Sequence, residues 1–172
     1  GYEIVPFEER ADVYVINTCS VTHLSDRKSR QIIRRATRMN PTACIAVAGC
    51  YAQVSPEEVR GLEGVRVVIG TEERARIVDY VEEALRADGV VEEITDVMQA
   101  RAFEDIPLHG VPHRTRAFLK IEDGCQNFCS FCIIPYARGP VKSRPLAAVA
   151  REMEKLAAAG FREVVLTGIH LG

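Results

Sequence analysis

Short apolar runs alternate with helical patterns in the first half of the sequence, and this alternation constrains the fold more than any other feature. Residues 11–19, 43–50 and 65–69 are typical of buried strands, and residues 25–39 are typical of a helix. Strands that alternate with helices favour a parallel sheet with both faces covered. We therefore expect an α/β domain, with a parallel sheet of Rossmann or flavodoxin type, over residues 1–88.

Two weaker patterns complete this expectation for the first half. Thr71 is expected to cap a helix that runs through Asp88, with Glu72 and Glu73 in its first turn, where the helix dipole favours acidic residues. Residues 2–6 are expected to add a strand at the edge of the sheet.

Residues 89–115 differ from their surroundings, because they contain several Gly and Pro residues and show no sustained period. We expect them to form an interdomain linker. Residues 116–122 then alternate like a strand, Pro145 stands near the start of a helix, and residues 163–167 are typical of another strand. This strand–loop–helix–strand order predicts the first part of a TIM-like α/β barrel over residues 116–172.

Three cysteines in the run C-Q-N-F-C-S-F-C carry the clearest chemical signal of the chain: Cys125, Cys129 and Cys132. Their spacing is too tight for ordinary disulfides and supplies one ligand fewer than a closed zinc site needs. Three thiolates on one loop are typical of ligands for a 4Fe-4S cluster, with the fourth iron left open for another ligand. The alternative is a zinc-binding loop whose fourth ligand is His109 or His113.

Two other cysteines, Cys19 and Cys50, lie just past the ends of predicted parallel strands. In open α/β sheets ligands bind at the carboxyl edge of the strands, so we expect these two thiols to converge on one metal site. Cys44 lies inside its strand among apolar residues, and we interpret it as a small hydrophobic residue of the core. A role for Cys44 as an additional metal ligand is the alternative.

The net charge of −2 conceals an uneven distribution of charged residues. Residues 1–56 carry seven basic and five acidic residues, and residues 106–151 carry seven basic and two acidic residues. Residues 57–105, in contrast, carry six basic and fourteen acidic residues. The basic segments contain the candidate metal ligands, which suits a polyanion near the metal sites. No run approaches the length of a membrane span, and we expect no secretory signal. Cysteines grouped for metal indicate a reducing, cytoplasmic location.

The helix expected over residues 25–39 has a dense cationic face. At about 100° per residue, an arc of about 160° holds six basic residues, and the opposite side holds apolar residues that would pack on the sheet. Solvated helices normally mix both signs of charge. We therefore expect this face to contact RNA phosphates, the alternative being an ordinary solvated face. The six residues are Arg27, Lys28, Arg30, Arg34, Arg35 and Arg38.

Several short sequence motifs around the cysteines resemble those of one enzyme family. The cysteine run, with Phe131 directly before its third cysteine, resembles the radical S-adenosylmethionine (SAM) enzymes. V-I-N-T-C-S-V-T and A-G-C-Y-A-Q, which contain Cys19 and Cys50, resemble the N-terminal domain of methylthiotransferases. D-R-K-S-R-Q-I-I-R-R-A, F-C-I-I-P-Y-A-R-G and V-L-T-G-I-H-L-G are most similar to the MtaB branch of that family. The resemblance covers essentially the whole chain, as an internal fragment of a longer enzyme.

The resemblance implies two 4Fe-4S clusters and SAM as cofactors. In the family, the three-cysteine loop binds the cluster that cleaves SAM reductively, and the resulting radical activates C2 of N6-threonylcarbamoyladenosine at position 37 of tRNA. A second cluster, held here by Cys19 and Cys50 with a third cysteine from upstream, carries the sulfur. Phe131 would lie beside the adenine of SAM, and Thr167 and Gly168 would lie beside its methionine part.

The same resemblance implies the partners: the anticodon loop of tRNA, SAM and a low-potential electron donor, with no membrane and no DNA. Arg138 is expected to face substrate or SAM, the alternative being a surface role, and the fragment is expected to be inactive alone. Two alternatives remain open. One is a methylthiotransferase that acts on another tRNA adenosine or on an aspartate of a ribosomal protein. The other is a non-catalytic, metal-binding RNA-binding module.

Overall fold

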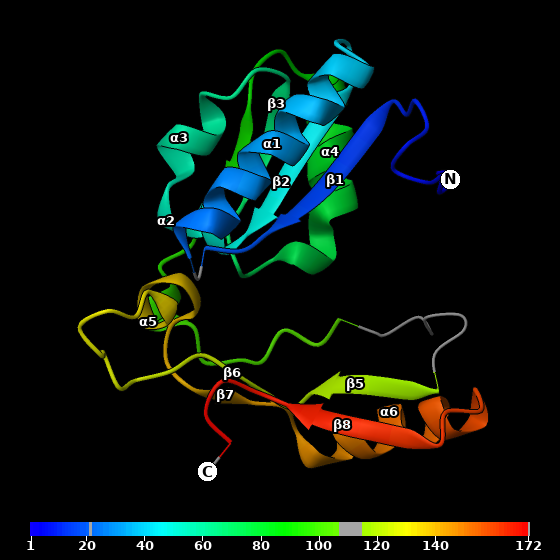
Figure 1. The fold of residues 1–172 in the computed structure, drawn as a ribbon, viewed down its shortest axis with the longest axis vertical. Coiled ribbons are helices and arrows are strands. Elements are labelled where there is room, and N and C mark those ends of the chain that lie inside the picture. Colours follow the sequence, from blue (N-terminus) through cyan, green and yellow to red (C-terminus); the bar gives the residue numbers. More distant parts are fainter. Residues whose placement is uncertain (21, 107–114, 172) are drawn as a thin grey trace. The chain divides into compact units, whose positions relative to one another are not determined.

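The computed structural model describes residues 1–20, 22–106 and 115–171, so His109 and His113 lie outside the described residues. The chain forms two compact units, Gly1–Val97 and Met98–Gly172 (Figure 1). Each unit has its own strands and helices. No helix in the described ranges is long and apolar enough to cross a membrane.

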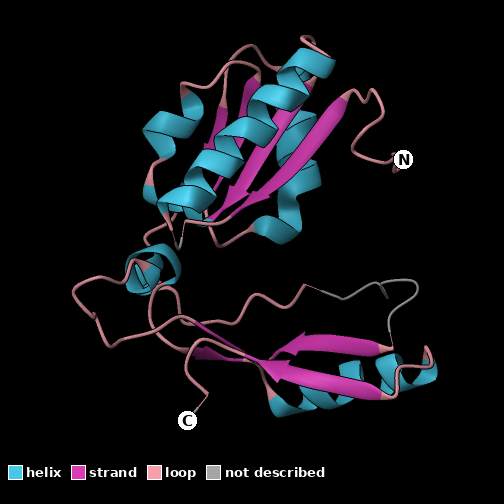
Figure 2. Ribbon diagram, in the orientation of Figure 1, coloured by secondary structure: helices cyan, strands magenta, loops and turns pink. Residues whose placement is uncertain are grey.

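A four-stranded parallel sheet forms the centre of the first unit (Figure 2). The strands lie in sequence order, and each pairs in parallel with the next. The predicted parallel α/β sheet is therefore confirmed. The strands are β1 (Val13–Thr18), β2 (Cys44–Gly49), β3 (Val65–Ile69) and β4 (Val91–Glu93).

Helices cover both faces of this sheet (Figure 1). They are α1 (His23–Met39), α2 (Cys50–Val54), α3 (Pro56–Arg60) and α4 (Ile77–Arg86). One core cluster packs Ile33 of α1 and Val59 of α3 against Ile45 of β2, and a second packs Val81 of α4 against Ala46 of the same strand. β2 is buried along its whole length because it lies between the two clusters, which explains its unbroken apolar run.

The helix expected to begin at Thr71 begins later, so that expectation is wrong. A short 3-10 turn, η1 (Arg74–Arg76), comes first, and α4 follows it. Glu73 has a left-handed backbone with φ of 59°, which interrupts a helical path from Thr71. The Thr71 backbone N–H donates instead to the Gln53 side chain at 3.1 Å.

The edges of the sheet also differ from the expectation. Residues 2–6 form no strand, so β1 is one edge of the sheet and β4 is the other. β4 lies within residues 89–115, where the sequence predicts only a linker, because a strand of three residues is too short to show a period. A second 3-10 turn, η2 (Val97–Gln99), follows.

The second unit contains a parallel strand pair separated in sequence by a helix, as predicted. β5 (Arg116–Lys120) pairs with β8 (Glu163–Thr167), and α6 (Leu146–Ala158) lies between them in the sequence. Gly160 follows α6 with φ of 90°, the conformation that favours glycine just after a helix. Three short elements were not predicted: β6 (Glu122–Asp123), α5 (Ile134–Arg138) and β7 (Lys142–Ser143).

Candidate metal centres

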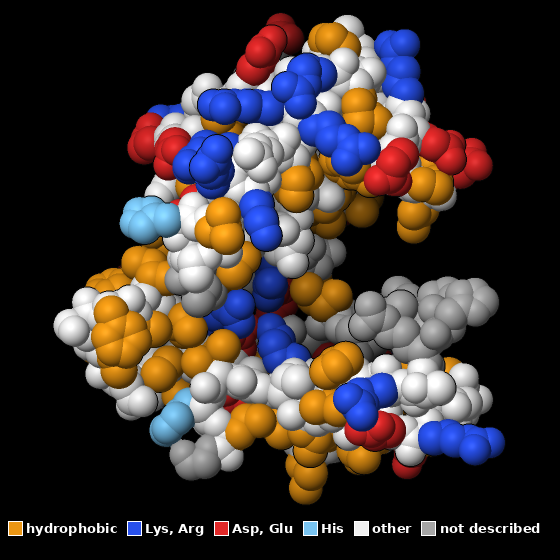
Figure 3. Space-filling view, in the orientation of Figure 1, with side chains coloured by type: hydrophobic (Ala, Val, Ile, Leu, Met, Phe, Trp, Pro, Cys, Tyr) orange, Lys and Arg blue, Asp and Glu red, His pale blue; other side chains and the backbone are white. Residues whose placement is uncertain are grey.

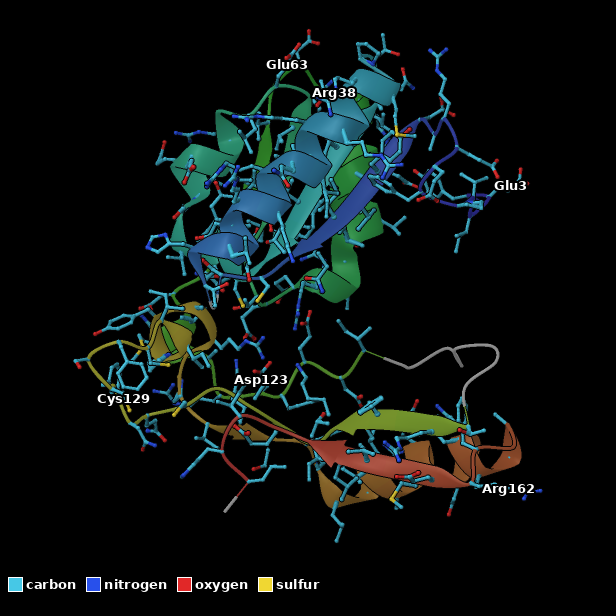
Figure 4. All side chains as sticks on the ribbon, in the orientation of Figure 1. Glu3, Arg38, Glu63, Asp123, Cys129 and Arg162 are labelled. Carbon is cyan, nitrogen blue, oxygen red and sulfur yellow. The ribbon has the colours of Figure 1, made fainter. Side chains whose placement is uncertain are left out.

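The three-cysteine loop of the second unit begins after β6 and returns through α5 to β7. These two strands pair antiparallel, so they form the base of the loop. Just beyond the strands, the Cys125 backbone N–H donates to the Gly139 carbonyl oxygen at 3.0 Å. Figure 4 shows Asp123 at this base and Cys129 on the loop. The loop therefore begins and ends at neighbouring positions.

The thiols of this loop are accessible. Cys129 is exposed, and Cys125 and Cys132 are half-buried. The Cys132 backbone N–H donates to the Cys129 carbonyl oxygen at 2.9 Å, which makes a tight turn between the last two cysteines. Phe128 has a left-handed backbone with φ of 46°, a conformation that is unusual for a bulky residue, and its ring meets Tyr136 edge-on at 5.6 Å. The three thiols thus share one short, folded loop.

The donor set of the loop fits a 4Fe-4S cluster by its chemistry. Thiolates are the usual ligands of such clusters, and each binds a different iron, so the sulfur atoms need not converge on one point. Within residues 1–20, 22–106 and 115–171, no three His, Cys, Asp or Glu side chains are grouped for a single metal ion. The zinc alternative depends on His109 or His113, which lie outside these ranges, so it stays an alternative.

Asp123 is the centre of a polar cluster at the base of the loop, and it is only 8% exposed. Its Oδ1 accepts hydrogen bonds from Arg138 at 2.9 Å and from the Gly124 backbone at 3.0 Å, and its Oδ2 accepts one from Lys120 at 2.7 Å. Burial opposes ionisation of the carboxyl group, but Lys120 and Arg138 outweigh it and hold the pKa of Asp123 below its usual value. The Asp123 carboxylate therefore links Lys120 of β5, which precedes the loop, to Arg138 of α5, which lies within the loop.

Glu122, the neighbour of Asp123 in β6, contacts the segment that follows β8. Its Oε2 accepts hydrogen bonds from the backbone N–H groups of Ile169 at 2.5 Å and His170 at 2.9 Å. A Cβ at Gly168 would lie 2.5 Å from this oxygen, so the contact requires glycine there. The other oxygen, Oε1, is buried and accepts no hydrogen bond from the described residues. A buried acceptor without a partner is costly, so the well-bonded Oε2 carries the contact of this side chain with the segment after β8.

The residues predicted to contact SAM all lie in this second unit. Phe131 is 91% exposed, and Thr167 and Gly168 are half-buried at the end of β8. The space beside Gly168 is taken by the Glu122 carboxylate, so internal packing accounts for the glycine. Arg138, which is expected to face substrate or SAM, donates to Asp123. Contact of the first three residues with SAM stays a prediction.

Cys19 and Cys50 lie at the carboxyl edge of the first sheet, as predicted. Thr18 and Gly49 are paired at the ends of β1 and β2, so the two cysteines are the next residues along neighbouring strands. Cys19 is exposed and Cys50 is buried. Gly49 has φ of 100°, and a Cβ there would lie 2.5 Å from the Thr18 carbonyl oxygen. Glycine therefore lets the chain turn into α2 this close to β1.

Other polar residues of the same two motifs hold the strand ends together. The Thr18 hydroxyl donates to the Ala48 carbonyl oxygen at 2.7 Å. The Gln53 side chain donates to the Thr95 carbonyl oxygen at 3.0 Å and accepts from the Thr71 backbone at 3.1 Å. Thr18 therefore links β1 to β2, and Gln53 links the segments that follow β3 and β4. These contacts give Thr18 and Gln53 a structural role and leave the cysteines as the candidate ligands.

Cys44 lies in the core of the first unit and is only 2% exposed. It packs in the cluster on the α4 side of the sheet. Burial raises the pKa of its thiol, and the charge of Arg66 offsets only part of this rise. The interpretation of Cys44 as a hydrophobic core residue is confirmed.

The predicted cationic face lies on α1, where Lys and Arg side chains gather (Figure 3). Arg30 donates to the Tyr51 hydroxyl at 3.1 Å and to the Glu58 carboxylate at 3.0 Å, and Arg35 lies 3.9 Å from the Glu8 carboxylate. The remaining four side chains are exposed and make no ion pair with the described acidic residues: Arg27, Lys28, Arg34 and Arg38.

Sequence reasoning missed Glu122 and Asp123, although the sequence carries a signal for them. They are the two acidic residues of a segment, 106–151, that holds seven basic ones. An isolated acidic pair directly before a candidate metal loop indicates specific contacts. Their partners could not be predicted, because Arg138 and Ile169 are distant in the sequence.

Comparison with known proteins adds independent findings. A model described as "Uncharacterized protein family UPF0004" matches residues 1–70. The chain is 48% identical along its whole length to the threonylcarbamoyladenosine tRNA methylthiotransferase MtaB of Bacillus subtilis, and 46% identical along 99% of its length to that of Aquifex aeolicus. A ribosomal protein uS12 methylthiotransferase RimO of Synechococcus sp. is 34% identical along 96% of the chain. The chain spans 38%, 42% and 36% of the lengths of these relatives, respectively.

A solved structure also matches. The radical S-adenosylmethionine methyltransferase TsrM of Kitasatospora setae aligns with a TM-score of 0.59 over 94% of this chain and 38% of its own, at 19% identity. At that identity the match shows a shared fold. The predicted α/β fold and the predicted resemblance to methylthiotransferases of the MtaB type are therefore confirmed.

Proposed function

We propose that this chain, a methylthiotransferase-type sequence along its whole length, is the cluster-binding part of an enzyme that adds a methylthio group at C2 of N6-threonylcarbamoyladenosine in tRNA. One observation carries the proposal: the 48% identity to a relative named for that nucleoside. A second relative with the same name is 46% identical, whereas the relative named for a ribosomal protein is 34% identical.

In the second unit, Cys125, Cys129 and Cys132 would hold the cluster that binds SAM. When bound, this cluster supplies an electron that cleaves SAM reductively. The residues of the chain hold and orient the cofactor. The exposed ring of Phe131 offers a stacking surface for adenine, and the backbone at Thr167 and Gly168 lies at the strand end where the methionine part would bind.

In the first unit, Cys19 and Cys50 would hold the second cluster. Their position after paired strand ends supports a shared site. Cys44 is buried in the core on the α4 side, so we propose that the third thiolate comes from elsewhere in the polypeptide. On this proposal the first unit is the methylthiotransferase domain, and the second is the start of the radical SAM barrel.

The cationic face of α1 would bind the tRNA backbone. Its unpaired cations are exposed and have no competing carboxylate in the described ranges, so they are available for phosphate oxygens. A modified adenosine in the anticodon loop is single-stranded and can be splayed out toward an active site. The enzyme would work in the cytoplasm with a low-potential electron donor.

The test uses the polypeptide that carries this sequence, reconstituted with iron and sulfide without oxygen. We expect about eight irons for two 4Fe-4S clusters. We also expect SAM-dependent release of 5′-deoxyadenosine, and a methylthio group on tRNA detected by mass spectrometry. Cys125→Ala should abolish 5′-deoxyadenosine release, whereas Cys44→Ala, the matched control, should leave it intact.

Two substrates decide between the tRNA and protein activities. Transfer to tRNA that carries N6-threonylcarbamoyladenosine, but not to tRNA without that modification or to ribosomal protein uS12, supports the proposal. Transfer to uS12 alone would show the alternative enzyme. Stoichiometric zinc with no cleavage of SAM would instead show a non-catalytic RNA-binding module.

A further inference from the structure

Glu122 and Asp123 make contacts on opposite sides of β6, because successive residues of a strand point to opposite faces. Asp123 binds the base of the cysteine loop, and Glu122 binds the backbone that follows β8. We propose that these adjacent carboxylates are positioning residues that set the loop and the end of β8 relative to each other. The inference rests on the proposed function, which places SAM between these two segments.

Asp123 closes the loop through donors from three places in the chain. Lys120 comes from β5, Arg138 comes from α5, and the backbone N–H of Gly124 comes from the start of the loop. The two sides of the base are in close contact, since a Cβ at Gly124 would lie 2.7 Å from the Gly139 carbonyl oxygen. Without the carboxylate, Lys120 and Arg138 would lose the acceptor that both of them bind. The base would open, and the spacing of the three cysteines would no longer be fixed.

Glu122 fixes the other segment. Its Oε2 binds two successive backbone N–H groups directly after β8, and hydrogen bonds to a charged acceptor are among the stronger ones. These bonds set the path of the chain at Gly168, which has no side chain to obstruct the carboxylate. Since Glu122 directly precedes Asp123, a shift at one segment would be transmitted to the other.

The first test concerns the cysteine loop, in the polypeptide that carries this sequence with Cys19→Ala and Cys50→Ala to remove the other cluster's ligands. We expect Asp123→Asn to lose iron to a chelator about tenfold faster than this parent, as is typical for residues that orient metal ligands. The electron paramagnetic resonance spectrum of its reduced cluster with SAM should also change. Arg138→Gln should have the same effect from the other side of the contact.

The control for this test is Arg116→Gln. Arg116 forms an exposed ion pair with Glu163 at 2.8 Å, also in the second unit but away from the loop base. Its iron retention and spectrum should equal those of the parent. If Asp123→Asn and Arg138→Gln retain iron as the parent does, the role of Asp123 is refuted.

The second test concerns the end of β8. We expect Glu122→Ala to weaken SAM binding, measured by equilibrium dialysis, about tenfold while iron content stays unchanged. Gly168→Ala should have the same effect with Glu122 intact, because its Cβ would displace the carboxylate, and the two effects should not add. Glu122→Gln should restore binding, since its amide oxygen accepts from the same N–H groups.

The outcomes distinguish a failure of the positioning role of Glu122 from a failure of the proposed function. If Glu122→Gln binds SAM as weakly as Glu122→Ala, Glu122 contacts SAM directly and the positioning role is refuted. If Glu122→Ala binds SAM normally, the role is also refuted. A parent protein that takes up no iron overturns the proposed function itself, before any variant is compared.

Discussion

The two groups of cysteines are held by different kinds of structure. Cys19 and Cys50 follow two paired strands, so backbone register brings them to one edge of a sheet. The cysteines of the second unit lie on a loop whose ends are joined through the Asp123 side chain. The first arrangement should therefore tolerate most side-chain changes and fail when the backbone is disturbed. The second should be sensitive to single polar side chains as well.

Gly49→Ala is the most direct way to break the backbone-held arrangement. The new Cβ would meet the Thr18 carbonyl oxygen at 2.5 Å, at a backbone φ of 100°. We expect it to lower the free energy of unfolding by about 3 kcal/mol or more. Urea denaturation measures this change, and iron analysis should show loss of the cluster at Cys19 and Cys50. Gly89→Ala, with φ of 120° and nothing within 4 Å, is the control and should lose only about 1–2 kcal/mol. Equal losses would contradict the steric argument.

Gly124→Ala applies the same test to the loop of the second unit. Its φ is 88°, and a Cβ would overlap the Pro140 carbonyl oxygen and lie 2.7 Å from the Gly139 carbonyl oxygen. We expect a loss of about 2–3 kcal/mol, because the short loop can shift more readily than two paired strands. Gly160→Ala, with φ of 90° and open space around it, is the control. A cluster that survives Gly124→Ala unchanged would show that the closed base is dispensable.

Charge reversal on α1 tests whether the first unit also binds RNA. Arg34→Glu with Arg38→Glu should weaken tRNA binding, measured by filter binding. It should also reduce the slope of log affinity against log salt by about 1.5, as expected for two lost phosphate contacts. Arg86→Glu on α4 is the control, since Arg86 already pairs with Glu82 at 2.8 Å. An unchanged salt slope would rule out contact of this helix face with phosphates.

The smallest effect is expected for Cys44→Ala. This variant tests whether Cys44 is a core residue or a metal ligand. Cys44→Ala removes one buried sulfur atom from a packed cluster and should lower the free energy of unfolding by only about 1 kcal/mol. The iron content should not change. Loss of iron in this variant would make Cys44 a ligand and would contradict its assignment to the core.

The regular elements of both units could be predicted from the sequence. β2 and β8 are marked by compact apolar runs, and α1 by its two distinct faces, because each pattern repeats over enough residues to reveal its period. The burial of Cys44 followed from its place inside such a run. The positions of Cys19 and Cys50 at one edge of the sheet could therefore be predicted, because they depend only on where β1 and β2 end.

The rest of the candidate site depends on contacts that leave no local pattern. β6 and β7 have two residues each, too few for any alternation. Arg138 is basic wherever it points, and only the folded chain shows that it turns inward to Asp123. The late start of α4 likewise follows from the left-handed backbone at Glu73. This backbone conformation could not be predicted from the presence of a glutamate.

The closed base of the cysteine loop has a consequence for the order of assembly. Its contacts involve the chain's own backbone and side chains, and none of them requires iron. Joining the ends of a flexible loop of this length costs roughly 2 kcal/mol of chain entropy, by the (3/2)RT ln n relation. Protein groups alone make the contacts that offset this cost. We therefore expect the base of the loop to close whether or not iron is bound.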